Sequence, residues 1–98
     1  MNTQALGLAL RAKKVVIGTD ITIKYLRLKR LELIILATDA SNNTKKMVYD
    51  KAKTYQVEVL EEKTSDEISR AIGKVGIKVL GITDKGFKKL LTAQKGSD

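Results

Sequence analysis

The chain has 98 residues and carries 19 lysine and arginine residues against 11 acidic ones, a net charge of +8, with no histidine and no cysteine. This length suffices for one domain with one hydrophobic core and is too short for two. Without cysteine there are no disulfides, thiol nucleophiles or thiolate zinc sites, and without histidine the commonest general base and metal ligand is missing. We therefore expect a single domain over residues 1–98 with no catalytic residues, no bound metal and no cofactor.

The positive charge is concentrated in the first 30 residues, which contain seven cationic side chains and one carboxylate. This distribution favours a polyanionic partner, and the alternative is a charged surface that serves solubility alone. No apolar run approaches the roughly 20 residues needed to span a bilayer, and the first residues do not resemble a signal peptide. We expect a cytoplasmic protein that does not associate with membranes.

Five segments show the apolar spacing of amphipathic helices, and each follows a turn or a capping residue. The second is expected over 20–30, and a fourth begins with capping-box spacing and stops at Gly73. The expected capping residues are Thr3, then Thr19 or Asp20, then Thr64 and Asp84. The inward positions are Ala5, Leu6, Ala9 and Leu10 in the first helix, Val48, Ala52 and Tyr55 in the third, Ile68, Ala71 and Ile72 in the fourth, and Phe87, Leu90 and Leu91 in the last.

Four shorter segments show the pattern of β-strands. Leu33–Ala37 and Ile77–Ile82 are apolar with little or no alternation, which predicts central strands covered on both faces. Val57–Leu60 is short and begins with alternation, as edge strands often do, and Val15–Ile17 stops at Gly18. The order α-β-α-β-α-β-α-β-α predicts an α/β fold in which a sheet lies between helix layers.

The most informative segment is the joint between the first strand and the second helix, from Gly18 to Lys24. A helix that begins here presents free backbone N–H groups, with a cation one turn later. Asp20, Lys24 and Arg27 would share one helix face, where cations meet phosphates and the carboxylate accepts from base N–H groups. The alternative is a capped helix with an ordinary Asp20–Lys24 surface pair and a solvated cationic face.

A second candidate site is the loop over 72–76, in which two glycines flank a cation and a β-branched residue. Such a loop can approach a ligand closely, and the alternative is a helix C-cap followed by a tight turn. The glycine spacing rules out a P-loop and a dinucleotide-binding fingerprint. The acidic residues form no clear catalytic pair, and the few aromatic residues are not spaced as a base-stacking platform.

Beyond these patterns, the chain resembles a known family over nearly its whole length, from Leu6 to Phe87. The similarity is carried by the order and spacing of short pieces, which are residues 11–16, Gly18-Thr19-Asp20 with Lys24, residues 37–44, residues 72–74 and residues 82–87. The family is the kink-turn-binding ribosomal protein superfamily, of the L-seven-Ae and L-thirty-e kind, and the chain most resembles its small bacterial YlxQ-type members.

The resemblance implies a three-layer α/β/α sandwich around a four-stranded mixed sheet. It also implies binding to a kink-turn, a sharply bent RNA with tandem sheared G·A pairs beside a bulge. In the family, the start of the second helix enters the groove at the G·A pairs, and a hydrophobic loop before the last strand packs against flipped-out bulge nucleotides. With Arg27 added from the same helix face, the implied RNA-binding residues are Gly18, Thr19, Asp20, Lys24, Arg27, Ile72, Gly73, Lys74 and Val75.

Two positions depart from the archaeal form of the motif, Gly-x-Asn-Glu-x-x-Lys. Asp20 stands in place of the asparagine, and Ile21 stands in place of the glutamate. An aspartate accepts from guanine N–H groups but repels phosphate, whereas an isoleucine accepts nothing. We therefore expect weaker base readout, with more of the binding left to Lys24, Arg27 and backbone N–H groups.

These observations support one main hypothesis. We expect a monomeric, non-catalytic protein that binds structured RNA of the kink-turn type and is associated with the ribosome, with ribosomal RNA as one candidate partner and no DNA partner. The alternative is a protein-interaction module on the same fold that binds an acidic protein through its basic face. An enzyme is the least supported class, because no set of reactive side chains converges. Residues 94–98 are expected to form a disordered tail.

Overall fold

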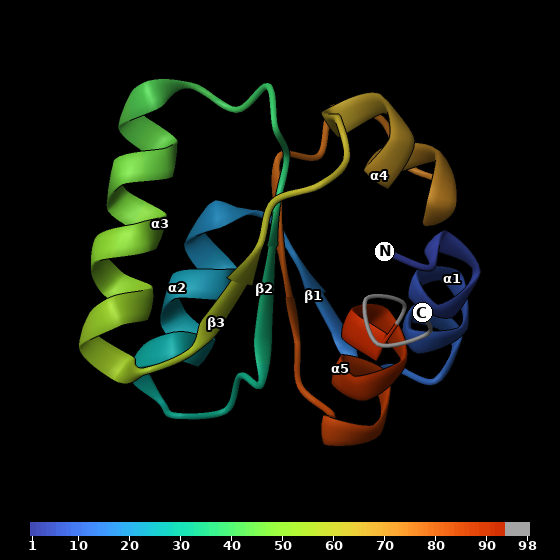
Figure 1. Cartoon of the computed structure of the whole chain (residues 1–98), viewed down its shortest axis with the longest axis horizontal. Coiled ribbons are helices and arrows are strands. Elements are labelled where there is room, and N and C mark those ends of the chain that lie inside the picture. The colour runs from blue at the N-terminus through green and yellow to red at the C-terminus, as the bar shows by residue number, and fades with distance from the viewer. Residues whose placement is uncertain (94–98) are drawn as a thin grey trace.

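A four-stranded mixed sheet between two layers of helices forms the framework of the protein in a computed structural model that describes residues 1–93 (Figure 1). The elements are α1 (Thr3–Arg11), β1 (Val15–Ile17), α2 (Thr19–Arg27), β2 (Leu33–Leu36), α3 (Asn42–Tyr55), β3 (Glu58–Leu60), α4 (Ser65–Ala71), β4 (Val79–Ile82) and α5 (Lys85–Thr92). The predicted alternation of helices and strands is confirmed. The tail predicted over 94–98 lies outside the described residues.

The strands lie in the order β1-β4-β2-β3. Strand β4 runs antiparallel to both β1 and β2, whereas β2 and β3 are parallel. Every residue of β2 and β4 is buried, because both strands have neighbours on each side and helices on each face. The prediction that these are the central strands and that β3 is an edge strand is confirmed.

Helices α2 and α3 cover one face of the sheet, and α1, α4 and α5 cover the other (Figure 1). Side chains from both layers meet the central strands in one continuous apolar core, which includes Leu6, Leu26, Ile35, Leu80 and Leu91, all fully buried. Removal of this apolar surface from water is the main stabilising contribution.

Two predicted helix starts are wrong. Asn2, rather than Thr3, caps α1, because its side chain accepts hydrogen bonds from the N–H groups of Gln4 and Ala5 at 3.0 and 3.3 Å. Helix α2 has neither Thr19 nor Asp20 as its N-cap. The N-cap is Gly18, at φ 106° and ψ 157°, a conformation that strongly favours glycine.

Predicted element boundaries also differ from the structure, by one residue at the end of β2 and at the start of β3, and by more in α2 and β4. Helix α2 ends at Arg27 instead of Arg30, because Lys29 adopts a left-handed conformation at φ 59° that closes the helix. Strand β4 begins at Val79 instead of Ile77, because the backbone of Ile77 is hydrogen-bonded to serine side chains of α4 rather than to a strand.

One predicted core position is wrong. Leu90 of α5 is 51% exposed, whereas its neighbour Leu91 is fully buried. Phe87 lies between these extremes and packs partly buried against the core. The apolar face of α5 is therefore narrower than the helical spacing indicated, and Leu90 lies outside it.

The sheet order predicts how the backbone amides exchange with solvent. Amides of β2 and β4 should exchange only when the whole domain unfolds, whereas those of the edge strand β3 also exchange through local opening. We expect exchange at Ile34 and Leu80 to be at least about tenfold slower than at Val59, measured by NMR. Equal protection at Val59 would contradict this difference between centre and edge.

Candidate nucleic-acid interface

The two segments identified from the sequence meet at one end of the sheet. The N–H of Gly18 donates to the carbonyl oxygen of Val79 at 2.9 Å, so the start of α2 adjoins the first residue of β4. The loop from Gly73 to Lys78, named the α4–β4 loop, leads directly into that residue. Figure 1 shows both segments at the upper end of the sheet. The sequence alone could not establish this proximity.

The start of α2 exposes backbone donors. Gly18 provides no side-chain cap, and the first hydrogen bond of the helix runs from the N–H of Thr22 to the carbonyl oxygen of Gly18 at 3.1 Å. The N–H groups of the preceding turn therefore have no cap, and they lie at the positive end of the helix dipole. Backbone groups in this arrangement suit an anion such as phosphate.

The three charged residues predicted to share one face of α2 do so. Asp20, Lys24 and Arg27 are exposed and line an open groove of about 460 Å³. Ile23 of α2, Leu28 just after its end and Met47 of α3 complete its wall. Within residues 1–93, neither Lys24 nor Arg27 is in an ion pair, so the predicted alternative of an Asp20–Lys24 pair is not formed.

The α4–β4 loop presents an apolar side chain to solvent. Val75 is 92% exposed, more than any other large hydrophobic residue in the described chain, and Lys74 beside it is also exposed. Gly73 and Gly76 flank these two residues at φ 67° and 73°. A Cβ atom at either glycine would meet nothing within 4 Å, so the glycines serve backbone conformation rather than close packing.

Ile72 is the one predicted site residue that the structure places away from the surface. It is 5% exposed and belongs to the hydrophobic core. Its side chain anchors the end of α4 below the loop, so the surface of the loop is formed by Lys74 and Val75 together with the two glycines.

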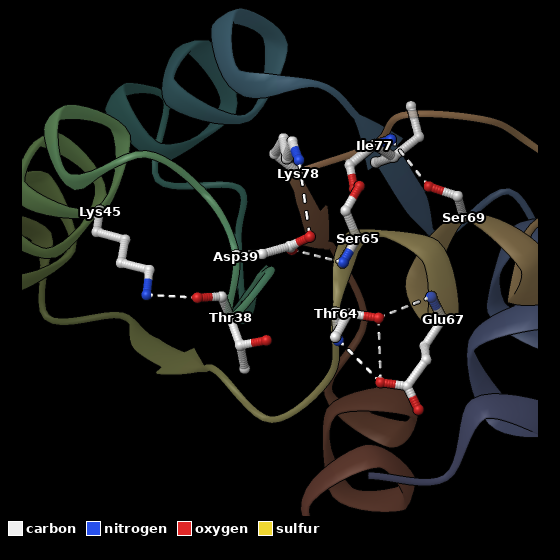
Figure 2. Close-up of polar contacts among 9 residues, drawn as sticks. All are labelled: Thr38, Asp39, Lys45, Thr64, Ser65, Glu67, Ser69, Ile77 and Lys78. Atoms are coloured by element: carbon white, nitrogen blue, oxygen red, sulfur yellow. Dashed lines mark hydrogen bonds and ion pairs between the residues drawn. The ribbon is translucent and has the colours of Figure 1, made fainter.

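Sequence reasoning missed the polar groups that hold this loop (Figure 2). The Ser69 hydroxyl accepts from the N–H of Ile77 at 2.8 Å, and the Ser65 hydroxyl donates to the carbonyl oxygen of Ile77 at 2.8 Å. Asp39, just beyond β2, accepts from the N–H of Ser65 at 2.8 Å and lies 3.9 Å from the Lys78 ammonium. The partners lie 8 to 39 residues apart in the chain, so no local spacing reveals them.

Asp39 remains ionised in this network. The hydrogen bond from Ser65 is the largest of the effects that hold the pKa of Asp39 below its ordinary value, and the nearby Lys78 and Lys45 act in the same direction. The carboxylate is thus a fixed negative charge beside the loop, and it engages part of the charge of Lys78.

Not every cation at this end of the sheet is available to a ligand. The Lys45 ammonium donates to the carbonyl oxygen of Thr38 at 2.6 Å and lies 2.8 Å from a Glu61 carboxylate oxygen. The Tyr49 hydroxyl donates to the other oxygen of Glu61 at 2.6 Å. Hydrogen bonds from Lys45 and then Tyr49 lower the pKa of Glu61, while burial and the bond to Glu61 raise the pKa of Tyr49 to about 12. This cluster is structural, in contrast to the unpaired Lys24 and Arg27.

The described residues contain neither a metal-binding cluster nor a membrane-spanning helix. Among residues 1–93, no three histidine, cysteine or acidic side chains are grouped so that they could hold a metal ion. No helix in the same part of the chain has the length and hydrophobicity to cross a bilayer.

Comparison with known proteins identifies relatives over most of the chain. A family model described as "Ribosomal protein L7Ae/L30e/S12e/Gadd45 family" matches residues 2–92. The RNA-binding protein YlxQ of Bacillus subtilis (strain 168) is 44% identical over 86 residues, which are 88% of this chain and 86% of that protein. The RNA-binding protein YlxQ of Enterococcus faecium is 44% identical over 84 residues, or 86% of this chain and 81% of its own.

Two solved structures share the fold. A protein of unknown function from Bacillus halodurans has a TM-score of 0.89 at 36% identity and covers 93% of this chain and 92% of its own. The Giardia lamblia 15.5kD RNA binding protein has a TM-score of 0.80 at 15% identity and covers 96% and 81%, which supports the fold alone.

The prediction of a non-catalytic protein agrees with this family of ribosomal proteins and with the two RNA-binding relatives. The resemblance to the bacterial YlxQ-type members is also confirmed by the two relatives at 44% identity. Since the family model spans residues 2–92, the chain belongs to the ribosomal protein L7Ae/L30e/S12e/Gadd45 family.

Proposed function

We propose that the protein binds structured RNA of the kink-turn type through the end of the sheet where the start of α2 meets the α4–β4 loop. The observation that carries this proposal is the pairing of two unlike surfaces in one place. One is an uncapped helix start with unpaired cations, and the other is a nearly fully exposed valine. The hydrogen bond from the N–H of Gly18 to the carbonyl oxygen of Val79, at 2.9 Å, joins the start of α2 to the strand that follows the loop.

The start of α2 would contact the sugar-phosphate backbone and the groove. Its uncapped N–H groups and the ammonium of Lys24 suit phosphate oxygens, and Arg27 extends the cationic face by one turn. Asp20 is exposed in the first turn of α2, where its carboxylate can accept hydrogen bonds from guanine N–H groups. This surface alone would bind many RNAs, because phosphate contacts carry no sequence information.

The α4–β4 loop would supply the preference for shape. Contact with a phosphate backbone buries little apolar surface of an exposed valine and so contributes little binding free energy. The valine can instead pack against bases that have left the helical stack. In a straight A-form duplex the bases remain stacked and paired, so Val75 would have no apolar partner. An RNA that satisfies both surfaces must therefore be bent and must present unpaired bases beside its widened groove.

The relatives support RNA as the ligand class, because two of them at 44% identity are named RNA-binding proteins. The family description names ribosomal proteins, so we propose ribosomal RNA as one candidate partner and the ribosome as a site of association in the cytoplasm. The net charge of +8 fits a polyanionic ligand. We further propose that the protein acts as a monomer, because each of the two surfaces is complete within one chain.

The groove between α2 and α3 favours a second candidate function. Leu28 and Met47 are 54% and 38% exposed there, beside Lys24 and Arg27. Apolar side chains rimmed by cations suit an acidic, amphipathic protein segment. Purified protein that carries no nucleic acid, as judged by the ratio of absorbance at 260 and 280 nm, would favour this alternative.

The phosphate contacts predict a dependence of RNA affinity on salt. The logarithm of the association constant should fall linearly with the logarithm of salt concentration, with a slope of roughly 0.7–0.9 per phosphate neutralised. Lys24→Ala should weaken binding to all RNAs tested and reduce the slope by about one phosphate contact.

Lys53→Ala is the matched control for this measurement, because Lys53 is an exposed lysine near the far end of α3. It should leave both affinity and slope nearly unchanged. If Lys24→Ala changes RNA affinity and slope no more than Lys53→Ala does, the result would favour the protein-interaction alternative.

The loop contact predicts a preference for bent RNA. Wild-type protein should bind a labelled kink-turn at least about 3 kcal/mol more tightly than the same RNA with its G·A pairs changed to Watson–Crick pairs. This lower bound lies just below the roughly 4–10 kcal/mol that separates specific from non-specific nucleic-acid binding. Val75→Asp places a carboxylate against the RNA and should erase most of that preference while the weak duplex binding remains. Fluorescence titration measures both affinities.

Leu90→Asp is the control for this experiment, since it replaces another exposed apolar side chain. Leu90 belongs to α5, which lies toward the opposite end of the sheet from α4 and the α4–β4 loop (Figure 1). The variant should retain the full preference. Equal affinity of wild type for both RNAs would refute the kink-turn proposal. Full preference in Val75→Asp would refute only the role of the loop.

A further inference from the structure

The residue that links the α4–β4 loop to β4 is held on both sides by buried side chains. Ile77 lies outside the strand ladder, yet the Ser69 hydroxyl accepts from its N–H and the Ser65 hydroxyl donates to its carbonyl oxygen, each at 2.8 Å. The two serines are 2% and 5% exposed. We call these two hydrogen bonds the serine clamp (Figure 2).

The clamp follows from the geometry of α4. Ser65 and Ser69 are four residues apart, so both project from one face of the helix toward the returning chain. Serine in a helix usually bonds its own backbone or solvent, and burial of its hydroxyl is favourable only when a partner is present. Here both hydroxyls reach a single residue across the loop, which is the ladder-like bonding that a neighbouring strand would otherwise supply.

The first part of the loop is fixed to the same helix. The N–H of Lys74 donates to the carbonyl oxygen of Ser69 at 2.8 Å, and that of Gly73 donates to the carbonyl oxygen of Arg70 at 3.2 Å. The serine clamp therefore fixes the loop where it meets β4, at Ile77, and these backbone bonds fix it where it leaves α4, at Gly73 and Lys74. Between them only the segment around Val75 projects freely.

The clamp also ties the loop to the start of α2. Immediately after Ile77, the carbonyl oxygen of Lys78 accepts from the N–H of Ala37 at 2.8 Å, and that of Val79 accepts from the N–H of Gly18 at 2.9 Å. The Asp39 carboxylate holds the backbone of Ser65 from the end of β2. The loop, the sheet end and the start of α2 are thereby parts of one hydrogen-bonded frame.

We propose that Ser65 and Ser69 are positioning residues for RNA binding, which set the place of Val75 relative to the start of α2 before the RNA arrives. This inference rests on the proposed function. Affinity gained through two separate surfaces depends on their spacing being fixed in advance, because ordering a loose loop on binding costs free energy. The serines touch the RNA through no atom of their own and act only through the loop.

Loss of the serine clamp should therefore weaken binding to the kink-turn and leave binding to the RNA with Watson–Crick pairs nearly unchanged. Ser69→Ala removes the acceptor for the Ile77 N–H, and Ser65→Ala removes the donor to its carbonyl oxygen. Either variant should weaken kink-turn binding by roughly fivefold to tenfold, which corresponds to the free energy that one hydrogen bond contributes. Binding to the RNA with Watson–Crick pairs should change less than about twofold, because it uses the cations of α2.

Ser41→Ala is the matched control. Ser41 caps α3 by accepting from the N–H of Thr44 at 3.1 Å, so the substitution makes the same chemical change and also costs a hydrogen bond. It should reduce thermal stability by an amount comparable to Ser69→Ala. Since it leaves the α4–β4 loop intact, the ratio of the two RNA affinities should stay at the wild-type value.

Hydrogen exchange in the protein without RNA gives a readout that is independent of the proposed function. The amide of Ile77 should be protected in wild type and in Ser41→Ala, and should exchange at least about tenfold faster in Ser69→Ala while β2 and β4 stay protected. A wild-type Ile77 amide that exchanges as fast as an exposed one would overturn the clamp itself.

The affinity ratios separate the two proposals. If wild type discriminates between the RNAs and both serine variants lose part of that discrimination while Ser41→Ala does not, the positioning role is supported. If wild type discriminates and the serine variants do so equally well, the positioning role is overturned and the RNA proposal stands. If wild type does not discriminate, both fail, whatever the exchange data show about the loop.

Discussion

A single backbone hydrogen bond, from the N–H of Gly18 to the carbonyl oxygen of Val79, determines what the molecule can present at one end of its sheet. It exists because β1 runs antiparallel to β4, so the end of one strand lies beside the start of the other. The chain then turns into α2 at φ 106°, a conformation that strongly favours glycine. A cationic helix start and an apolar loop thus become neighbours although about 55 residues separate them in the chain.

The two neighbours make different physical contributions to recognition. Charge acts over roughly 8–10 Å at physiological salt and favours any polyanion, whereas an exposed valine contributes only through direct contact. Cations that already have partners, such as Lys45 and in part Lys78, contribute to the framework rather than to ligand binding. In the proposed binding mode, Lys24 and Arg27 would therefore supply the electrostatic attraction of this surface, and Val75 would supply its preference for RNA shape.

Local patterns in the sequence were sufficient for much of this architecture. Non-alternating apolar runs identify β2 and β4 as central, because burial on both faces removes the need for polar residues. The left-handed turn at Lys29 and the clamp on Ile77 could not be predicted, since the first uses a residue with no preference for that conformation and the second joins distant segments. The same holds for Ile72, whose burial depends on how α4 packs.

The departure at Ile21 changes what the start of α2 can offer a ligand. Ile21 is partly buried, and its Cγ2 atom lies closest to the position where a Cβ of Gly18 would stand, at 3.9 Å. An apolar side chain here lies beside the glycine turn and offers no hydrogen-bond acceptor to a ligand. Under the proposed function, binding would then depend more on Lys24, Arg27 and the backbone N–H groups, and on the fixed spacing of the two surfaces. A protein that binds RNA as proposed would distinguish RNAs chiefly by shape, because its specificity would lie in the rigid frame rather than in base-specific donors and acceptors.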